Sequence, residues 1–468
     1  MVKNSIITLL FISVNAFAQV QKTDTTKLSQ GLTLNIGVLA SEPSGVPFWM
    51  AHNNGGRFSE NQTSSMYSGL HYYGKYRLND WLSTDWEAET MSSAGLEGMY
   101  GSIIQANFSV ATPIIKFSAG LDEEFFRLND SELSFGNLLY GNNALPLPKI
   151  RLETNGWLES PILPKVFSFK IYMAHGWFEN NRTQSGAYLH QKYFYGRAQF
   201  FKKRLSLMGG FHDNAMWAGR NLNTEEVQPT GFKNFTRVLF GMNGGDDALQ
   251  TDQNNALGNH LGTFDLKGSY QFRNFKLATY WQFLWEDGSG MTISKWRDGI
   301  GGLSLSLNEK AFVDQFVFEL VRTNDQNAYK IDGDGNPFIE PDNFFNNGVY
   351  NGGWTYNNRV IGSPLFVLVD VENSLANNIQ NMVNAFNIGI GGHFKSASYI
   401  LKYKEFENHG KIQTPLEEDL FVKSIDLSVN YDFSGKSALG VRANYQNSNF
   451  SVGNSFAMQL SYRYKFSF

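Results

Sequence analysis

The sequence predicts an all-β protein, an antiparallel transmembrane β-barrel of about eighteen strands with long extracellular loops. Three observations lead to this prediction: segments of alternating polarity, a succession of short and long connections, and an N-terminal export signal. The composition agrees with it, because the 468-residue chain is 15% aromatic and 18% charged and contains 45 glycines. Such a mixture suits strands and turns better than helices.

The alternation is clearest in residues 456–468 (FAMQLSYRYKFSF). Its even positions are apolar or aromatic, whereas its odd positions are small or polar and include Arg463 and Lys465. A period of two places these sets on opposite faces of a strand. Segments 425–433, 439–446 and 264–272 repeat the pattern. Strands of about ten residues, apolar outside and polar inside, are typical of outer-membrane barrels.

The same reading divides the whole chain into strands. Counting back from the C-terminus, we predict strands at 456–468, 439–447, 425–433, 398–405, 386–394, 312–321, 301–307, 276–284, 264–272, 204–211, 193–201, 166–174, 148–157, 114–121, 103–110, 81–91, 67–77 and 32–40. An even number suits a barrel with both termini in the periplasm. The weakest segments are 148–157, 103–110 and 67–77, so a count of sixteen stays open.

The connections support this arrangement independently. Seven links of one parity are short, at 434–438, 395–397, 308–310, 273–275, 201–204, 112–113 and 78–80. The intervening links are mostly longer, and the longest join residues 211 to 264 and 321 to 386. Short turns mark the periplasmic end of such barrels and long loops the exterior.

The N-terminus has the pattern of a secretory signal peptide. Lys3 supplies the positive charge, residues 6–14 the apolar core, and residues 16–18 (AFA) a small-x-small cleavage site. We therefore expect residues 1–18 to be removed and residues 19–468 to form one outer-membrane β-barrel domain. The apolar core is too short to span a bilayer as a helix, which needs about 20 residues. A buried N-terminal strand is the weaker alternative.

Several function classes are disfavoured by what the chain lacks. A formal net charge of −4 argues against nucleic-acid binding. The absence of cysteine excludes disulfides, thiolate catalysis and cysteine zinc sites. The eight histidines show no metal-binding spacing, and we interpret His190 as a structural residue of the lumen. With no Gly-x-Ser-x-Gly motif, we expect no catalytic residue, no metal and no cofactor.

Four stretches resemble the Wzi capsule assembly family: residues 46–59 (VPFWMAHNNGGRFS), 133–153 (LSFGNLLYGNNALPLPKIRLE), 183–197 (TQSGAYLHQKYFYGR) and 353–365 (GWTYNNRVIGSPL). The resemblance runs through nearly all of residues 19–468, and the second and fourth stretches are the most distinctive. It implies an outer-membrane barrel of eighteen strands whose lumen is closed by helices and loops. It also implies a surface lectin that holds capsular polysaccharide. The composition is similar to that of the Bacteroidota branch.

A lectin needs aromatic rings for the faces of sugars and planar polar groups for hydroxyls. The richest cluster contains Trp354, Tyr356, Asn358 and Arg359, in which Arg359 suits a uronic acid carboxylate. A second candidate loop holds Trp285, Trp296 and Arg297, and Trp217 lies beside another long link. The alternative interpretation places any one of these residues in the interfacial aromatic girdle or in loop packing.

Three other features bear on chemistry. Residues 332–340 (DGDGNPFIE) begin like a calcium loop, but Pro337 replaces the glycine at position six and no acidic residue stands at position twelve, just before Phe344, so a polar turn is the preferred interpretation. Asp122, Glu123 and Glu124 suggest an acidic mouth rather than a glycosidase pair. Lumen charges such as Lys267, Arg442, Arg463 and Lys465 are expected to pair with Asp265, Asp426 or Asp432 across neighbouring strands, and tuning of a pore is the alternative.

The leading hypothesis is therefore a non-enzymatic outer-membrane lectin that anchors capsular or surface polysaccharide in a Gram-negative bacterium. A passive porin or uptake channel is the alternative from another class, because barrels of this size also form pores. An outer-membrane hydrolase is a weaker third hypothesis. The expected partners are the polysaccharide, outer-membrane lipid and, during biogenesis, the barrel-insertion machinery that reads a terminal aromatic strand.

Overall fold

The computed structural model describes residues 28–42, 45–59, 62–96, 98–124, 126, 128–129, 132–291, 296–326, 329–331, 335–339, 341–369 and 378–468. The predicted signal peptide, residues 1–18, lies outside this part of the chain. So do residues 332–334 and 340 of the segment compared with a calcium loop.

One antiparallel sheet contains nineteen strands within the described residues. Because β7 (Leu158–Glu159) is a two-residue strand beside β8, eighteen strands form the wall. They are β1 (Leu28–Glu42), β2 (Ser64–Arg77), β3 (Ser83–Gly95), β4 (Gly98–Ala111), β5 (Ile115–Leu121), β6 (Lys149–Thr154), β8 (Phe167–Trp177), β10 (Tyr188–Phe200), β11 (Leu205–Trp217), β13 (Asn259–Gln271), β14 (Phe275–Glu286), β15 (Gly299–Leu307), β16 (Gln315–Arg322), β23 (Val383–Phe394), β24 (Ala397–Lys411), β25 (Thr414–Asp432), β26 (Ser437–Ser448) and β27 (Ser455–Ser467).

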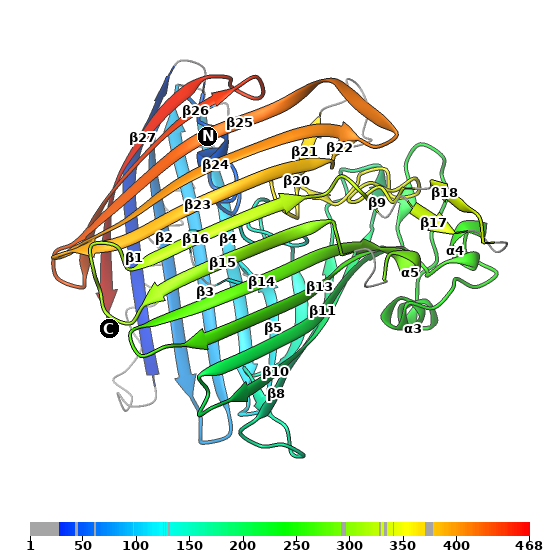
Figure 1. The fold of residues 1–468 in the computed structure, drawn as a ribbon, viewed down its shortest axis with the longest axis horizontal. Coiled ribbons are helices and arrows are strands. Elements are labelled where there is room, and N and C mark those ends of the chain that lie inside the picture. The colour runs from blue at the N-terminus through cyan, green and yellow to red at the C-terminus, as the bar shows by residue number, and fades with distance from the viewer. Residues whose placement is uncertain are drawn as a thin grey trace, which may run out of the picture.

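The sheet closes on itself because β1 pairs with β27, with Leu32 opposite Phe466 and Ile36 opposite Tyr462 (Figure 1). Closure leaves no unpaired strand edge, which a bilayer cannot hydrogen-bond. Each predicted strand overlaps one wall strand, so the all-β barrel of eighteen strands is confirmed.

The two faces of the wall differ as the alternation predicts. Along β27, Phe456, Met458 and Leu460 point outward with 48%, 47% and 39% of their surface exposed. Ala457, between the first two, is fully buried. Outward residues of other wall strands, such as Phe108 of β4 and Leu266 of β13, are also more than half exposed. This apolar belt is the surface that a barrel presents to acyl chains.

The connections cluster by length at the two ends of the barrel, which we call the short-turn end and the long-loop end. Two tight links at the long-loop end depart from the rule. The β3–β4 link is residues 96–97, and the β24–β25 link is residues 412–413. In the second case the strands continue beyond their predicted ends as a hairpin, in which Lys423 pairs with Glu405 at 2.9 Å.

Helices are few and short: α2 (Phe48–Ala51), α3 (Phe232–Phe240), α4 (Gln250–Asn254) and α5 (Asp287–Gly290). Among the described residues, no helix has the length and apolarity needed to cross a membrane. Short hairpins decorate the long loops, namely β9 (Gln184–Ser185) with β12 (Arg220–Asn221), β17 (Tyr329–Ile331) with β18 (Pro337–Ile339), β19 (Thr355–Tyr356) with β20 (Arg359–Val360), and β21 (Val367–Val369) with β22 (Asn378–Gln380).

The lumen charges follow the sequence expectation only in part. Arg442 on β26 binds Asp426 on β25 through its Nε atom at 3.0 Å, as predicted. Asp265 instead accepts a hydrogen bond from the Tyr195 hydroxyl. Lys267 donates to the carbonyl oxygen of Leu128, in a loop that enters the lumen. A loop thus supplies an acceptor for Lys267, which the sequence pattern did not predict.

Candidate functional site

Three segments from the long-loop end fold into the barrel, and together we call them the plug: residues 45–59 with α2, the described part of residues 122–148, and residues 341–369. Their apolar side chains form the main hydrophobic core of the molecule. Phe48 and Trp49, Phe135 and Leu138, and Phe345 and Trp354 are each at most 2% exposed. The barrel mouth is thus filled by packed side chains, as in a soluble protein core.

Glu319 on β16 anchors the second plug segment to the wall. Its carboxylate accepts hydrogen bonds from the Ser134 hydroxyl at 2.5 Å and from the Phe135 amide at 2.7 Å. The wall residues Tyr280 and Asn387 donate to the same carboxylate at 2.6 and 2.9 Å. Glu319 is fully buried, so these four donors replace the water that the group loses.

The first segment is held by charged residues of β24 and β26. Arg442 donates from Nη2 to the carbonyl oxygen of Trp49 at 2.9 Å. The ammonium of Lys404 lies 3.9 Å from the centroid of the Trp49 ring, a cation–π contact. The amide of Phe48 donates to the Gln446 side chain at 2.6 Å. Inward polar residues of the wall thereby fix α2 against the lumen.

Arg359 joins the third segment to the first. Its guanidinium donates to the carbonyl oxygens of Ala51 at 2.7 Å and Phe58 at 2.6 Å. The next two residues bind the second segment, since Asn143 donates to the Val360 carbonyl at 3.0 Å and Gly141 to that of Ile361 at 2.8 Å. All three plug segments therefore meet at the β19–β20 hairpin.

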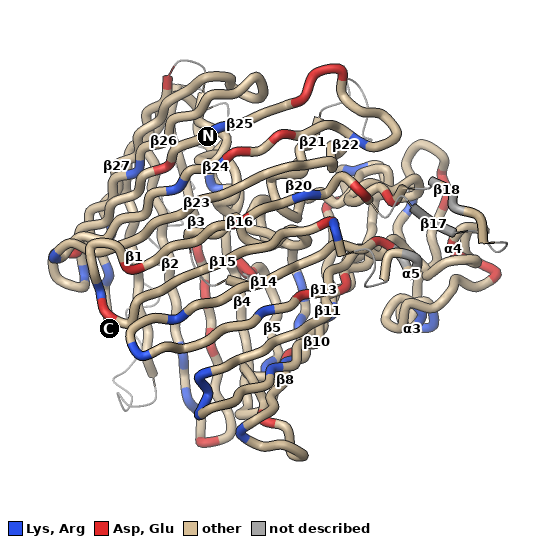
Figure 2. The backbone as a smooth tube through the Cα atoms, viewed as in Figure 1, with Lys and Arg blue, Asp and Glu red and all other residues tan. Residues whose placement is uncertain are grey.

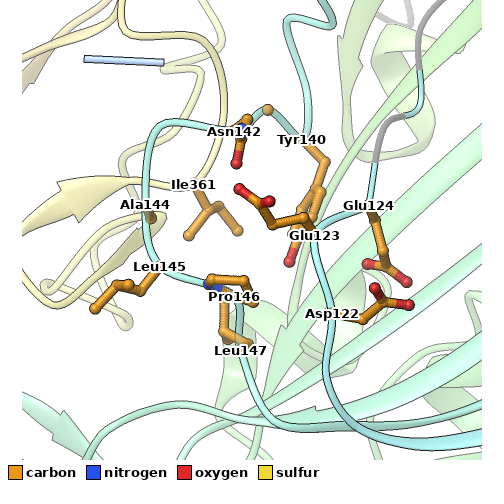
Figure 3. A pocket seen from close by; sticks show the side chains of 11 residues that line it. Asp122, Glu123, Glu124, Tyr140, Asn142, Ala144, Leu145, Pro146, Leu147 and Ile361 are labelled. Carbon is orange, nitrogen blue, oxygen red and sulfur yellow. The ribbon is translucent and has the colours of Figure 1, made fainter. Parts of the chain in front are cut away.

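Three adjacent carboxylates line a small cavity of about 10 Å³ between the second and third plug segments (Figure 3). Each has a cationic partner: Asp122 binds Arg151 at 2.6 Å, Glu123 binds Arg57 at 2.5 Å, and Glu124 binds Lys149.

The partners set the protonation of these acids. Burial opposes ionisation of Glu124, but Lys149 and Arg151 outweigh it and lower the pKa of that carboxyl. For Asp122, burial outweighs Arg151 and raises the pKa. The predicted acidic mouth is thus a set of internal ion pairs.

Three of the predicted sugar-binding tryptophans are buried, one in the plug and two under loops on the outer side of the wall. Trp354 is 1% exposed, and its indole nitrogen donates to Asn259 at 2.6 Å. Trp285 and Trp217 are 2% and 3% exposed and pack on the outer side of the wall. The rings of Trp354 and Trp217 are enclosed by protein and have no free face for a pyranose, whereas the ring of Trp285 borders a cleft on the outer side of the wall. Their burial favours the packing interpretation, because apolar burial stabilises a tryptophan more than any exposed position does.

Four other predicted residues lie closer to the surface. Asn358 is exposed at the tip of the β19–β20 hairpin, and Tyr356 is half-buried beside it. Burial, with a smaller contribution from Glu179, raises the pKa of the Tyr356 hydroxyl. In the other predicted loop, Trp296 is 53% exposed and Arg297 is 63% exposed. The structure does not bring the two loops together into one cluster, because Trp296 packs edge-on against Trp281 of the outer wall.

The hairpin tip meets a neighbouring loop that the sequence did not single out. Residues 178–187 connect β8 to β10, and the Asn357 amide donates to Glu179 in this loop at 3.2 Å. Arg182 supports the contact from below, donating to the carbonyl oxygens of Thr355 at 3.0 Å and Gly353 at 2.8 Å. Asn180 and Asn181 beside it are exposed.

We call Tyr356, Asn357, Asn358, Glu179, Asn180 and Asn181 the amide strip. The strip combines four asparagines with an aromatic ring on the outer face of the plug. Asn357 and Asn358 both have positive φ, 49° and 58°, as a type I′ hairpin turn requires. The adjacent asparagines in residues 180–181 and 357–358 were a signal in the sequence for tight turns, and all four lie exposed at the surface.

The other chemistry considered from sequence finds little support. Among the described residues, no group of three or more histidine and acidic side chains is arranged to hold a metal ion. The sequence predicted that His190 faces the lumen, and this prediction is wrong. It lies on the outer side of β10 with its ring 5.4 Å from that of Phe235 in α3. Parity explains the error, because its neighbour Gln191 occupies the lumen face and contacts Lys149 at 2.8 Å.

The family assignment follows from a match over residues 44–461 to the family described as Capsule assembly protein Wzi. The chain belongs to the Wzi family. The protein is accordingly an outer-membrane β-barrel of a Gram-negative bacterium, with a plugged lumen. No curated protein sequence matches the chain.

Solved structures agree with the fold. The chain is similar to Wzi of Escherichia coli, described as an outer-membrane protein involved in group 1 capsule assembly and a carbohydrate-binding β-barrel. The TM-score is 0.61 at 13% identity, over 98% of this chain and 88% of that one. The barrel OccAB2 of Acinetobacter baumannii gives 0.50 at 10% identity, over 94% and 98%. At these identities the likeness shows the fold alone.

Proposed function

We propose that this protein is a non-enzymatic lectin that anchors capsular polysaccharide at the cell surface, with the amide strip as its sugar-binding face. The observation that carries the proposal is that three loops close the mouth and present asparagines and a tyrosine outward. A closed mouth suits retention of a polymer better than its passage. Asparagine side chains offer a donor and an acceptor to sugar hydroxyls.

The proposal includes an orientation and a lineage. The long-loop end faces the outside, where capsule is found, and the short-turn end faces the periplasm. Residues 1–18 act as the signal peptide, and the alternating aromatic strand β27 is read by the barrel-insertion machinery. The resemblance in composition supports a member of the Bacteroidota type, whose polysaccharide has its own chemistry.

The test is the amount of polysaccharide that remains on cells. Deletion of the protein releases polysaccharide into the medium while total synthesis is unchanged. Replacing Tyr356, Asn357 and Asn358 together with alanine lowers the bound fraction by about tenfold, the effect of losing roughly 1.4 kcal/mol of binding free energy. Asn274→Ala, an exposed asparagine at the short-turn end, is the matched control and has no effect. Unchanged retention in the deletion strain refutes the proposal.

The passive channel remains the competing function, and planar-bilayer conductance separates the two. The packed core of the plug predicts that the purified barrel shows no steady ion current. A stable, open current from every inserted molecule means that the plug leaves the lumen, and the protein is then a channel.

A further inference from the structure

Residues 218–258 form a lobe, containing α3 and α4, that stands beside the barrel wall and outside the plug (Figure 1). It leaves β11 and returns at β13. The lobe packs on the outward face of these strands, since Lys192 of β10 donates to the Val238 carbonyl in α3 at 3.3 Å. Lys192 has the opposite parity to Gln191 and Asn214, which bond to each other on the lumen face at 3.1 Å.

The wall changes polarity under the lobe. Toward the short-turn end, Phe194 and Leu266 point outward and are 48% and 56% exposed. Phe194 is paired with Phe211, and two residues further toward the long-loop end Lys192 is paired with Asp213. One step of this kind is about 7 Å along a strand. An apolar row followed at once by a charged row is expected where the acyl chains of a leaflet meet its headgroups.

The charged row is a connected network. Lys192 binds Asp213 at 2.6 Å, and Asp213 contacts Nδ1 of His260 at 3.2 Å. Nε2 of His260 lies 3.2 Å from the Leu257 carbonyl at the end of the lobe. Asp213 and His260 are each 4% exposed in their side chains, so the lobe and the wall together shield them.

A cleft of about 840 Å³ separates the lobe from the wall at this level. Its apolar lining includes Phe211 and Trp285 of the wall and Phe240 of α3. Its polar lining includes Lys192, His260 and Asn254, together with the carboxylates of Asp213 and Asp342. The two rings of the wall are stacked, with centroids 5.4 Å apart. The cleft is therefore amphiphilic, with its apolar side continuous with the lipid-facing aromatic row.

The rim of the cleft is apolar and exposed. Phe232, Phe240 and Met242 are 80%, 72% and 53% exposed on or directly after α3. Lys233 is exposed beside them, and Figure 2 shows basic residues on this helix. An amphipathic helix with large apolar side chains and a basic residue is typical of insertion at a membrane interface. In water this surface would be unfavourable, whereas within a leaflet acyl chains cover it.

We infer that the cleft binds one glycolipid of the outer leaflet, a phosphorylated, acylated glucosamine of the lipid A type. An acyl chain lies along Phe211 and Phe240, and the sugar headgroup meets Asn254 and Asn255, which are exposed and line the cleft. Lys233, exposed on α3, supplies a positive charge at the lobe surface for the headgroup phosphate. The inference rests on the proposed orientation, because only that places the lobe in the outer leaflet. It gives the lobe a role separate from the amide strip.

Native mass spectrometry of the detergent-extracted barrel tests this inference. Incubated with equal amounts of purified lipid A and phosphatidylethanolamine, the barrel retains one lipid A in preference by about tenfold. Phe240→Asp and Lys233→Glu each reduce that retention by a similar factor. The control is Phe312→Asp, which changes a 69% exposed phenylalanine at the short-turn end and leaves retention unchanged.

Equal retention of both lipids, or full retention by both lobe variants, overturns the inference, because either result describes ordinary annular lipid. Both variants alter exposed side chains, and heat-modifiable migration on gels verifies that they fold. Surface polysaccharide measured on cells carrying Phe240→Asp keeps the two proposals apart. Normal glycan with lost lipid A retention supports the cleft, whereas lost glycan with normal lipid A retention refutes a distinct lipid site in this lobe.

Discussion

The guanidinium of Arg359 donates a hydrogen bond of 2.7 Å to the carbonyl oxygen of Ala51, more than three hundred residues away in the chain. A second bond, to the Phe58 carbonyl, completes the contact between the first and third plug segments. Arg359 was expected to bind sugar, but its donors point into the protein.

Arg359→Ala is predicted to loosen the plug. Two carbonyl oxygens then lose their donor, at a cost of about 1–3 kcal/mol each if they stay buried. We expect limited proteolysis to cut residues 45–59 much faster than in the wild type. Arg359→Lys keeps the charge but cannot span both carbonyls, and it has an intermediate effect. Arg297→Ala, at a 63% exposed position, is the control and leaves the cleavage rate unchanged.

Glu319→Gln is predicted to detach the second plug segment from the wall. The carboxylate accepts four hydrogen bonds through two oxygens. In glutamine an NH2 group replaces one of these oxygens, so the donors that faced that oxygen lose their acceptor. The expected loss is about 2–4 kcal/mol of local stability. Hydrogen exchange of residues 133–139 measures it, with Glu309→Gln on an exposed turn as the comparison. Equal exchange in the two variants contradicts the anchoring role.

The plug is predicted to weaken in mild acid through His52. Burial, with the nearby Arg359 charge, lowers the pKa of this imidazole from 6.5 to about 3. The unfolded segment therefore binds a proton below pH 6.5 that the folded segment does not bind. Stability from this group is complete above pH 6.5 and falls as the pH drops toward 3, at up to about 1.4 kcal/mol per pH unit.

His52→Gln removes this titration while keeping a polar side chain. We expect proteolysis of residues 45–59 to accelerate between pH 7 and pH 4 in the wild type and to change less in the variant. The comparison is made at each pH with a protease whose activity is calibrated on an unfolded peptide. Parallel profiles for both proteins mean that His52 does not control the acid response.

Substitutions at Trp354 and Tyr356 are predicted to affect different properties: the folded fraction for Trp354 and the affinity for polysaccharide for Tyr356. Trp354→Phe removes the donor to Asn259 and leaves a gap in the core, so the folded fraction decreases while the folded molecules keep their affinity for polysaccharide. Tyr356→Ala keeps the fold and lowers affinity. Binding of purified polysaccharide to folded barrels, counted by heat-modifiable migration, separates the two. Loss of affinity in folded Trp354→Phe assigns the sugar contact to the buried ring instead.

The wall was predictable because each strand carries its own evidence. In residues 456–468 the apolar even positions face lipid and the polar odd positions face the lumen. A shift by one residue would place Arg463 in lipid. Tight turns such as residues 272–274 are also local. Sequence therefore located every wall strand, even β6, whose six residues are among the shortest.

The long loops have no regular alternation of polar and apolar residues. The wrong predictions for residues in or under these loops all follow from this lack of pattern. Trp354 has the same sequence signature whether it stacks on a sugar or packs in a core. Only the folded chain shows Asn259 as the partner of its indole. His190 was assigned to the wrong side of the wall because no loop was expected to cover the outer face, where a polar side chain would otherwise meet lipid.

The sequence by itself determined the barrel, the position of its strands and the face that each strand turns to lipid, because those depend on a local alternation imposed by two solvents; the structure decided between eighteen strands and sixteen. Tertiary structure decided that three loops enter the lumen, that Arg359 joins them, and that the lobe of residues 218–258 turns outward. These outcomes depend on contacts such as Glu319 with Ser134, made between residues 185 positions apart. No short window of sequence contains both partners of such a contact.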